Sequence, residues 1–282
     1  MNANNLNRDG LWTPDVWKDI DTAVLAEVGA IRIAQKVFPS TPMPGAANVP
    51  ADIFRPQSMS ISEGQTKAFI EISIEFQLTQ SQVDNEITLH TARTLAKLSA
   101  KSIALAEDSL IHQGEDAKLP PTVKVVNRES ANSGLLGAAR ANKPIEVKHL
   151  PNKPGVYGED TFRAVTKGMA DLGKEGQPGP YALVLESTIY ADTYAPLPTT
   201  LVTTADRLTP LLPGGFYGTG TLPESTGLLV SLGGEPTSIF VGVDAITAYT
   251  QEDLEGRHRF RVFERVQFVA RDPRAFIRLE FK

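Results

Sequence analysis

Residues 68–78, which read AFIEISIEFQL, constrain the fold of this chain more than any other segment. Apolar side chains occupy every second position, and mostly polar ones lie between them. This alternation predicts a long strand with one buried and one solvated face. The preceding SEGQTK segment predicts a turn, which would join this strand to a partner containing Met59 and Ile61. Two long strands closed by a polar tip predict an extended arm over residues 50–80, whose apolar face is formed by Ile70, Ile72, Ile74 and Phe76.

Two long helices are predicted on either side of this arm. The first begins at Pro14, with Thr13 as its N-cap, and Pro39 and Pro42 follow its end. Its apolar stripe consists of Trp17, Ile20, Val24, Val28 and Ile31. The second helix is expected to be capped by Asp84 or Asn85 and to end at Gly114. Its less regular stripe consists of Leu95, Leu98, Ile103, Ala106 and Leu110.

The remaining chain mixes shorter elements. Residues 115–158 are rich in Lys, Pro, Gly and Asn and contain short β-like pieces, so we expect a long surface excursion there. A helix from 159, a buried strand from 181 and a short helix from 187 should follow. The tail alternates over 258–272 and again over 274–282, which predicts strands. The fold class is therefore α+β: a few helices on antiparallel sheets, with an extended arm.

Composition excludes several classes of protein. The chain has 282 residues, 41% hydrophobic content and a net charge of −5, so it can form a sizeable core but lacks the basic balance of a nucleic-acid binder. Cysteine is absent, which excludes disulfides and thiolate metal sites. No segment reaches the ~18 apolar residues of a membrane span, and the first residues do not resemble a signal peptide. We expect a cytoplasmic protein with no membrane or nucleic-acid partner.

The sequence also offers no evident catalytic site. Its four histidines lie far apart in unrelated contexts, and no hydrolase, metalloprotease or phosphate-loop motif occurs. The glycines of LPGGFYGTGTLP (212–223) lack dinucleotide-binding spacing. Glu71 and Glu75 share the polar face of one strand, where a solvated surface is a commoner explanation than a cation site. We therefore expect no enzyme, no cofactor and no metal.

The order of these segments resembles the encapsulins, the shell proteins of bacterial protein nanocompartments. Four segments carry the resemblance besides AFIEISIEFQL and the DNE that follows it. They are W-x-x-I-D in the first helix (Trp17, Ile20 and Asp21), SGLL after the second helix, GPYALVL, and LLVSLGGEPTSIFVGVDAITAYT near the end. The last segment contains a Gly-Gly turn and Asp244, which we interpret as a turn or capping carboxylate.

The resemblance implies the Hong Kong 97-like capsid fold, with an N-terminal helix, an extended arm (E-loop), a peripheral domain and an axial domain. The implied boundaries are 1–49 for the N-terminal helix and extended segment, 50–80 for the arm, 81–159 for the peripheral domain, 160–250 for the axial domain and 251–282 for C-terminal strands that return to the peripheral domain.

The resemblance also implies a function. It predicts a structural shell protein that self-assembles into an icosahedral, virus-like nanocompartment around a cargo enzyme. A phage major capsid protein of the same fold is one alternative, and a stand-alone α+β ligand-binding protein or enzyme is another. The arm face of Ile70, Ile72, Ile74 and Phe76 would lie between subunits.

Further sites follow from the same resemblance. The cargo, a ferritin-like protein or a peroxidase, would bind through a C-terminal targeting peptide on Val24, Val28 and Ile31. The loop with Asp192, Tyr194, Pro196 and Pro198 would line a five-fold pore. Some encapsulins bind flavin against a tryptophan near the end of the arm strand, but Leu78 to Val83 contain none.

Overall fold

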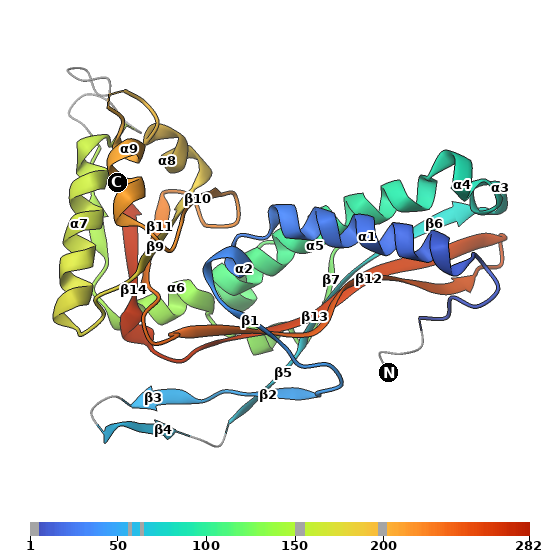
Figure 1. Cartoon of the computed structure of the whole chain (residues 1–282), viewed down its shortest axis with the longest axis horizontal. Coiled ribbons are helices and arrows are strands. Elements are labelled where there is room, and N and C mark those ends of the chain that lie inside the picture. The colour runs from blue at the N-terminus through green and yellow to red at the C-terminus, as the bar shows by residue number, and fades with distance from the viewer. Residues whose placement is uncertain (1–5, 56–57, 63–64, 150–155, 197–201) are drawn as a thin grey trace.

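The computed structural model describes residues 6–55, 58–62, 65–149, 156–196 and 202–282. A long five-stranded sheet runs along most of an elongated molecule, and a second, shorter five-stranded sheet lies at one end (Figure 1). A thin two-stranded arm projects beneath the long sheet. The long sheet runs in the order β1 (Ser40–Pro42), β12 (Thr237–Glu252), β13 (Arg257–Ala270), β6 (Ile70–Thr79) and β7 (Lys124–Val126), and only the β1–β12 pair is parallel.

Two helices cover one face of the long sheet. α1 (Pro14–Ile31) packs on α5 (Thr91–Gln113) and on β12, while α5 packs on β6 and β13. The short α2 (Ala34–Val37) follows α1. The predicted start of α1 at Pro14 is confirmed, although the Thr13 side chain makes no capping hydrogen bond. The apolar faces of these elements form the main core of the molecule.

The second helix begins later than predicted. Asn85 precedes only a four-residue helix, α4 (Glu86–Leu89), and His90 then adopts a left-handed conformation with φ of 49°. The Glu86 carboxylate accepts hydrogen bonds from the backbone amides of Ala92 (2.7 Å) and Arg93 (3.0 Å). A side chain from outside the helix therefore satisfies amides of its first turn. The predicted end at Gly114 is confirmed.

The second sheet runs in the order β10 (Phe216–Thr219), β9 (Tyr181–Glu186), β11 (Thr226–Ser231), β14 (Phe276–Phe281) and β8 (Ile145–Val147). α7 (Glu159–Lys174) packs on it and buries Val165 and Leu172. Two strands lie within the predicted C-terminal region 251–282. β13 belongs to the long sheet, whereas β14 belongs to the second sheet. β12 was expected in the axial domain, yet it pairs with β13 over most of its length.

The predicted surface excursion over 115–158 is wrong where the segment joins the two sheets and the core, although most of its described residues are exposed or half-exposed. β7 extends the long sheet, β8 extends the second sheet, and the Leu135 side chain between them is fully buried. Leu135 lies in α6 (Gly134–Ala138). β8 buries Ile145 and Val147, whereas β7 contributes only the half-buried Val125, so these strands are short pieces with few core side chains.

The other described elements are short. They are α3 (Gln80–Asp84), α8 (Ser187–Asp192), α9 (Thr204–Leu208), and 3-10 turns at Gly114–Asp116, Arg128–Ala131, Ala139–Ala141, Thr209–Leu211 and Pro273–Ala275. The arm contains two small ladders, β2 (Asn48–Pro50) with β5 (Thr66–Ala68) and β3 (Ile53–Arg55) with β4 (Ser60–Ser62).

Candidate assembly interface

The arm has little core of its own. Two-stranded ladders are marginally stable in water, so the arm depends on contacts at its base. There Val49 packs with Phe69, Phe240 and Val269 in a small separate cluster. Further out, the Phe54 amide donates to the Arg271 carbonyl at 3.0 Å, and the Arg271 guanidinium lies 5.7 Å from the Phe54 ring centre. These contacts fix the base of the arm to the body.

The outer part of the arm exposes large apolar side chains. Met59 is 92% exposed and Ile61 is 55% exposed, and Ile53 on the paired strand is about half exposed. Apolar side chains gathered on a thin projection are typical of a surface that another chain covers.

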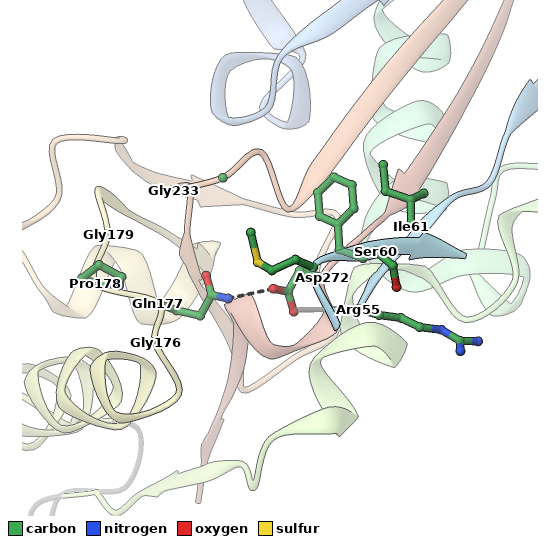
Figure 2. A pocket seen from close by; sticks show the side chains of 12 residues that line it. Arg55, Ser60, Ile61, Gly176, Gln177, Pro178, Gly179, Gly233 and Asp272 are labelled. Carbon is green, nitrogen blue, oxygen red and sulfur yellow. Dashed lines mark hydrogen bonds between the residues drawn. The ribbon is translucent and has the colours of Figure 1, made fainter. Parts of the chain in front are cut away.

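A pocket of about 690 Å³ lies between the arm and the body (Figure 2). The arm provides Phe54, Met59 and Ile61, and the body provides the loops 176–179 and 233–234 together with Asp272. In Figure 2, Gln177 points toward Asp272 across the floor of the pocket, and its amide donates to that carboxylate at 2.8 Å. The arm side of the pocket thus combines apolar Phe54, Met59 and Ile61 with polar Arg55 and Ser60, and its floor is polar.

The polar floor is fixed by charge. Arg274 donates to both oxygens of Asp272, at 3.0 and 2.8 Å. Burial alone would raise the pKa of Asp272, but the hydrogen bonds and charge of Arg274 produce a net lowering. Asp272 is thus an ionised, fully engaged carboxylate and not a free acid.

Two glycines explain how the body loops meet at this pocket. A Cβ on Gly233 would lie 2.7 Å from the Gly179 carbonyl oxygen, closer than real Cβ atoms approach. Gly234 has φ of 74°, which side-chain-bearing residues rarely adopt. The Gly-Gly turn therefore allows two loops to pack backbone against backbone.

The prediction for Ile70, Ile72, Ile74 and Phe76 is wrong as far as the first three are concerned. Ile70, Ile72 and Ile74 are buried in the chain's own core under the helices, and Phe76 is half-buried against it. The alternation was interpreted correctly as a strand with one buried face. Its burial is provided by α5 of the same chain and not by a neighbour, because β6 pairs with β13 inside the long sheet.

The predicted cargo-binding residues Val24, Val28 and Ile31 do not form an open surface. Val24 and Val28 are fully buried between α1 and the sheet, so a peptide cannot reach them, while Ile31 is half-buried. Periodicity identifies the apolar face of a helix, but it does not say whether that face meets the protein or a ligand.

A groove that was not predicted lies at the start of the same helix. It has a volume of about 640 Å³ and is lined mainly by Arg8, Trp12, Trp17, Asp21 and Leu25. Arg8 donates to both oxygens of Asp21 at 2.7 Å and lies 4.6 Å from the Trp17 ring centre. The W-x-x-I-D pattern contained two of these residues.

The predicted pore residues lie at the end of α8. Asp192 accepts hydrogen bonds from the amides of Tyr157 (3.0 Å) and Gly158 (3.1 Å), so its carboxylate holds the start of α7. Tyr194 is half-exposed and its hydroxyl lies 2.8 Å from that of Tyr190. Pro196 is exposed, and Pro198 lies outside the described residues.

A second exposed apolar surface lies on the side of α5 away from the sheet. Leu98, which was expected in the buried stripe, is 58% exposed, and Leu105 is also exposed. Ile87 and Leu89 on the neighbouring α4 are exposed as well. The buried residues of α5 instead include the small Ala92, Ala96 and Ala100.

The polar groups singled out in the sequence are engaged in structural contacts. Glu71 pairs with Arg261 and Glu75 with Lys124, both at 2.8 Å. Asp244 is not a turn residue: it lies at an irregularity of β12 and pairs with Arg32 at 2.9 Å. Within the described ranges, no group of three or more His, Cys, Asp or Glu could hold a metal ion. None of the helices in those ranges is long and apolar enough to cross a membrane.

Comparisons with solved structures identify the fold. The virus-like particle from Pyrococcus furiosus superposes with a TM-score of 0.66 at 15% identity, covering 94% of this chain and 99% of that one. The capsid of Myoviridae phage XM1 superposes with a TM-score of 0.57 at 11% identity, covering 89% of this chain and 92% of that one. The chain therefore has the predicted Hong Kong 97-like capsid fold.

Sequence comparisons identify the family. The type 1 encapsulin shell protein EncA of Myxococcus xanthus (strain DK1622) is 29% identical over 119 residues, which is 42% of this chain and 41% of that protein. The alignment thus spans less than half of that relative. A family model described as "Encapsulating protein for peroxidase" (Linocin_M18) matches residues 3–267. Because that match spans nearly the whole sequence, this chain belongs to the encapsulin family.

Proposed function

We propose that this chain is a structural shell protein that self-assembles into a closed icosahedral compartment around a cargo protein. The observation that carries the proposal is the arm, which exposes Met59 and Ile61 without covering them. Family membership and the capsid fold support the same conclusion. We infer that the chain has no enzymatic turnover of its own.

The proposed contact between copies joins two exposed apolar surfaces. The arm surface (Ile53, Met59 and Ile61) and the outer surface of α4 and α5 (Ile87, Leu89, Leu98 and Leu105) lie on different parts of the molecule. A contact between unlike surfaces is heterologous, and repeated contacts of this kind close into rings when the rotation between copies permits. We propose that the arm of one copy covers the outer surface of α4 and α5 of the next.

Substitution on the arm tests assembly. Ile61→Asp places an unpaired charge in the proposed contact while leaving the chain's own core unchanged, so shells should be lost and the isolated chain should stay folded. Ile61→Val is the matched control and should assemble. Sedimentation velocity gives the particle size, and circular dichroism confirms the fold.

Two results would contradict the proposal. One is a wild-type chain that sediments only as monomers or dimers at micromolar concentration. The other is a set of normal shells from Ile61→Asp. Ile72→Asp is not informative here, because Ile72 is buried within a single chain.

We propose that the N-terminal groove (Arg8, Trp12, Trp17, Asp21 and Leu25) binds the C-terminal targeting peptide of the cargo. Aromatic and aliphatic walls beside an ion pair suit an extended peptide with aliphatic anchors. The family description points to a peroxidase as the cargo, and a ferritin-like protein is the second candidate.

Leu25 offers a direct test of this groove, because its side chain is exposed and lines it. Leu25→Asp should give normal shells that contain no co-expressed cargo, whereas Leu25→Met should load cargo normally. Equal cargo content in the two variants, measured by gel densitometry of purified shells, would place the binding site elsewhere.

A further inference from the structure

Arg32, directly after the last residue of α1, reaches carboxylates on three other elements. Its Nε lies 2.5 Å from Glu107 on α5, and its other nitrogens contact Asp244 on β12 and Glu264 on β13. The Arg32 side chain is only 6% exposed. We name these four residues the Arg32 cluster; they join the end of α1 to the helix and the two strands beneath it.

The charges of the Arg32 cluster do not balance. Asp244 is half-exposed, so water screens its charge, but Glu107 and Glu264 are 0% and 1% exposed. One guanidinium thus faces two fully buried carboxyls. Oε1 of Glu264 has no hydrogen-bond partner among the described residues. A buried, uncompensated carboxylate is strongly unfavourable. When α1 is packed on the body, which we call the docked state, a proton shared by Glu107 and Glu264 is therefore favoured.

The pKa values of the Arg32 cluster agree with this geometry. Burial raises the pKa of Glu264 well above its usual range and the charge of Glu107 adds to this, although Arg32 opposes it. For Arg32 itself, burial alone would lower the pKa, but the charges of Glu264, Glu107 and Asp244 raise it. The guanidinium therefore stays charged, and the proton that can leave belongs to the carboxyls.

Asp108 is a further titratable group beside Arg32 and Glu107 among the described residues. Asp108 on α5 accepts hydrogen bonds from the amides of Ile33 (2.8 Å) and Ala34 (2.9 Å), directly after Arg32. Burial and the charge of Glu107 raise the pKa of Asp108 to about 7. From α2, the uncharged Gln35 donates to Glu107 at 2.7 Å. On β6, the residue paired with Glu264 is the apolar Ile72.

We propose that the Arg32 cluster is a proton-dependent latch, which holds the end of α1 on the body and releases it as the pH rises. The docked state retains a proton that the exposed carboxyls of an undocked state would lose. Undocking therefore releases a proton and is favoured at higher pH. The stabilisation is complete below the ordinary carboxyl range and is lost as the pH rises toward the raised value in the docked state.

Hydrogen exchange of the wild-type protein tests the latch directly. Between the ordinary carboxyl pKa of the undocked state and the raised pKa of the docked state, loss of one proton increases the equilibrium constant for undocking of α1 up to tenfold per pH unit. After correction for intrinsic rates, exchange of the α1 amides should rise in this way between pH 5 and pH 9. The α7 amides, which lie in the other part of the molecule, are the internal reference and should show a flatter profile. A wild-type α1 profile no steeper than that of α7 overturns the proposal.

Glu264→Gln assigns the proton. Glutamine fills the same space without ionising. In this variant the rise in α1 amide exchange with pH should therefore be smaller by up to tenfold per pH unit, and only the contribution of Asp108 should remain. Glu75→Gln, at a half-exposed carboxylate paired with Lys124, is the matched control and should keep the wild-type slope. An α1 profile for Glu264→Gln as steep as that of wild type overturns the proposal.

Tryptophan fluorescence provides an independent measurement. The chain has only two tryptophans: Trp12 lies just before α1 and Trp17 lies in its first turns. Their emission should shift to the red as the pH rises, with the same midpoint as the exchange of α1. Since both rings also line the N-terminal groove, the latch would couple that groove to pH, a consequence that rests on the proposed cargo function.

Discussion

The indole ring of Trp12 stacks on the ring of Phe260, with centroids 5.1 Å apart and planes 11° from parallel. Trp12 also donates from Nε1 to the Val83 carbonyl at 2.9 Å. Phe76 stacks on the same Phe260 ring at 5.2 Å. One aromatic group therefore joins the N-terminal segment, the strand before α3 and the C-terminal strand β13, which are far apart in sequence.

Trp12→Ala should lower the free energy of unfolding by about 3 kcal/mol, the lower end of the range for removing a large aromatic side chain, because Trp12 is only half-buried. Trp12→Phe keeps a stacking ring but loses the hydrogen bond, so its cost should be smaller. Urea denaturation at one fixed protein concentration measures both. Equal stability of Trp12→Ala and wild type would show that the stack contributes nothing.

Gly233→Ala should destabilise the protein by roughly 1–3 kcal/mol, because the new methyl group would overlap the Gly179 carbonyl oxygen and push two loops apart. Gly173→Ala is the matched control. Gly173 lies in α7 with no atom near its missing Cβ, so alanine there should be neutral or stabilising by up to about 1 kcal/mol. The thermal unfolding midpoint should therefore fall for Gly233→Ala and stay equal or rise for Gly173→Ala, and an unchanged midpoint for Gly233→Ala would contradict the close approach.

His112 should make stability fall in acid. The side chain is fully buried, and burial lowers the pKa of His112 to about 4. Its stabilisation is present above the unfolded pKa near 6.5 and is lost as the pH falls toward 4, by roughly 3 kcal/mol in total. His112→Gln should remove this part of the dependence. Urea denaturation midpoints measured between pH 7 and pH 4 test this. If stability falls with pH as steeply in His112→Gln as in wild type, His112 is not the cause.

The end of α8 should lie near a symmetry axis if the pore prediction holds. Tyr190 and Tyr194 pair through their hydroxyls, and desolvation together with this pairing raises the pKa of Tyr190 to about 12. The Asp192 carboxylate is already engaged by the backbone amides of Tyr157 and Gly158 at the start of α7. An electron microscopy map that placed Tyr194 far from every axis would refute the pore.

Local patterns predicted the elements whose signals lie within one segment. The alternation over 68–78 predicted β6, and Pro14 and Gly114 marked the start of α1 and the end of α5. The start of α5 was missed because its first-turn amides are satisfied by Glu86 across a left-handed His90. That arrangement has no repeating signal in the sequence.

The candidate sites were predicted less well, because periodicity identifies an apolar face without identifying what covers it. Ile72 and Val28 belong to correctly predicted apolar faces, yet both are covered by the same chain. Leu98 was expected inside and is exposed, while the buried residues of α5 include the small Ala92, Ala96 and Ala100. The arm itself was predicted, but its exposed side chains are Met59 and Ile61 and not those of the long strand.

The sequence by itself determined the fold class, the positions of the main helices and strands, and the family, because these depend on local periodicity, capping residues and motifs. Only the tertiary structure decided which apolar faces remain uncovered and which charges meet. Arg32, Glu107 and Glu264 are separated by more than 70 residues from one another, and nothing local relates them. They form one cluster because the packing of α1 on α5 and the long sheet brings their backbones together, and burial then makes their charges interact.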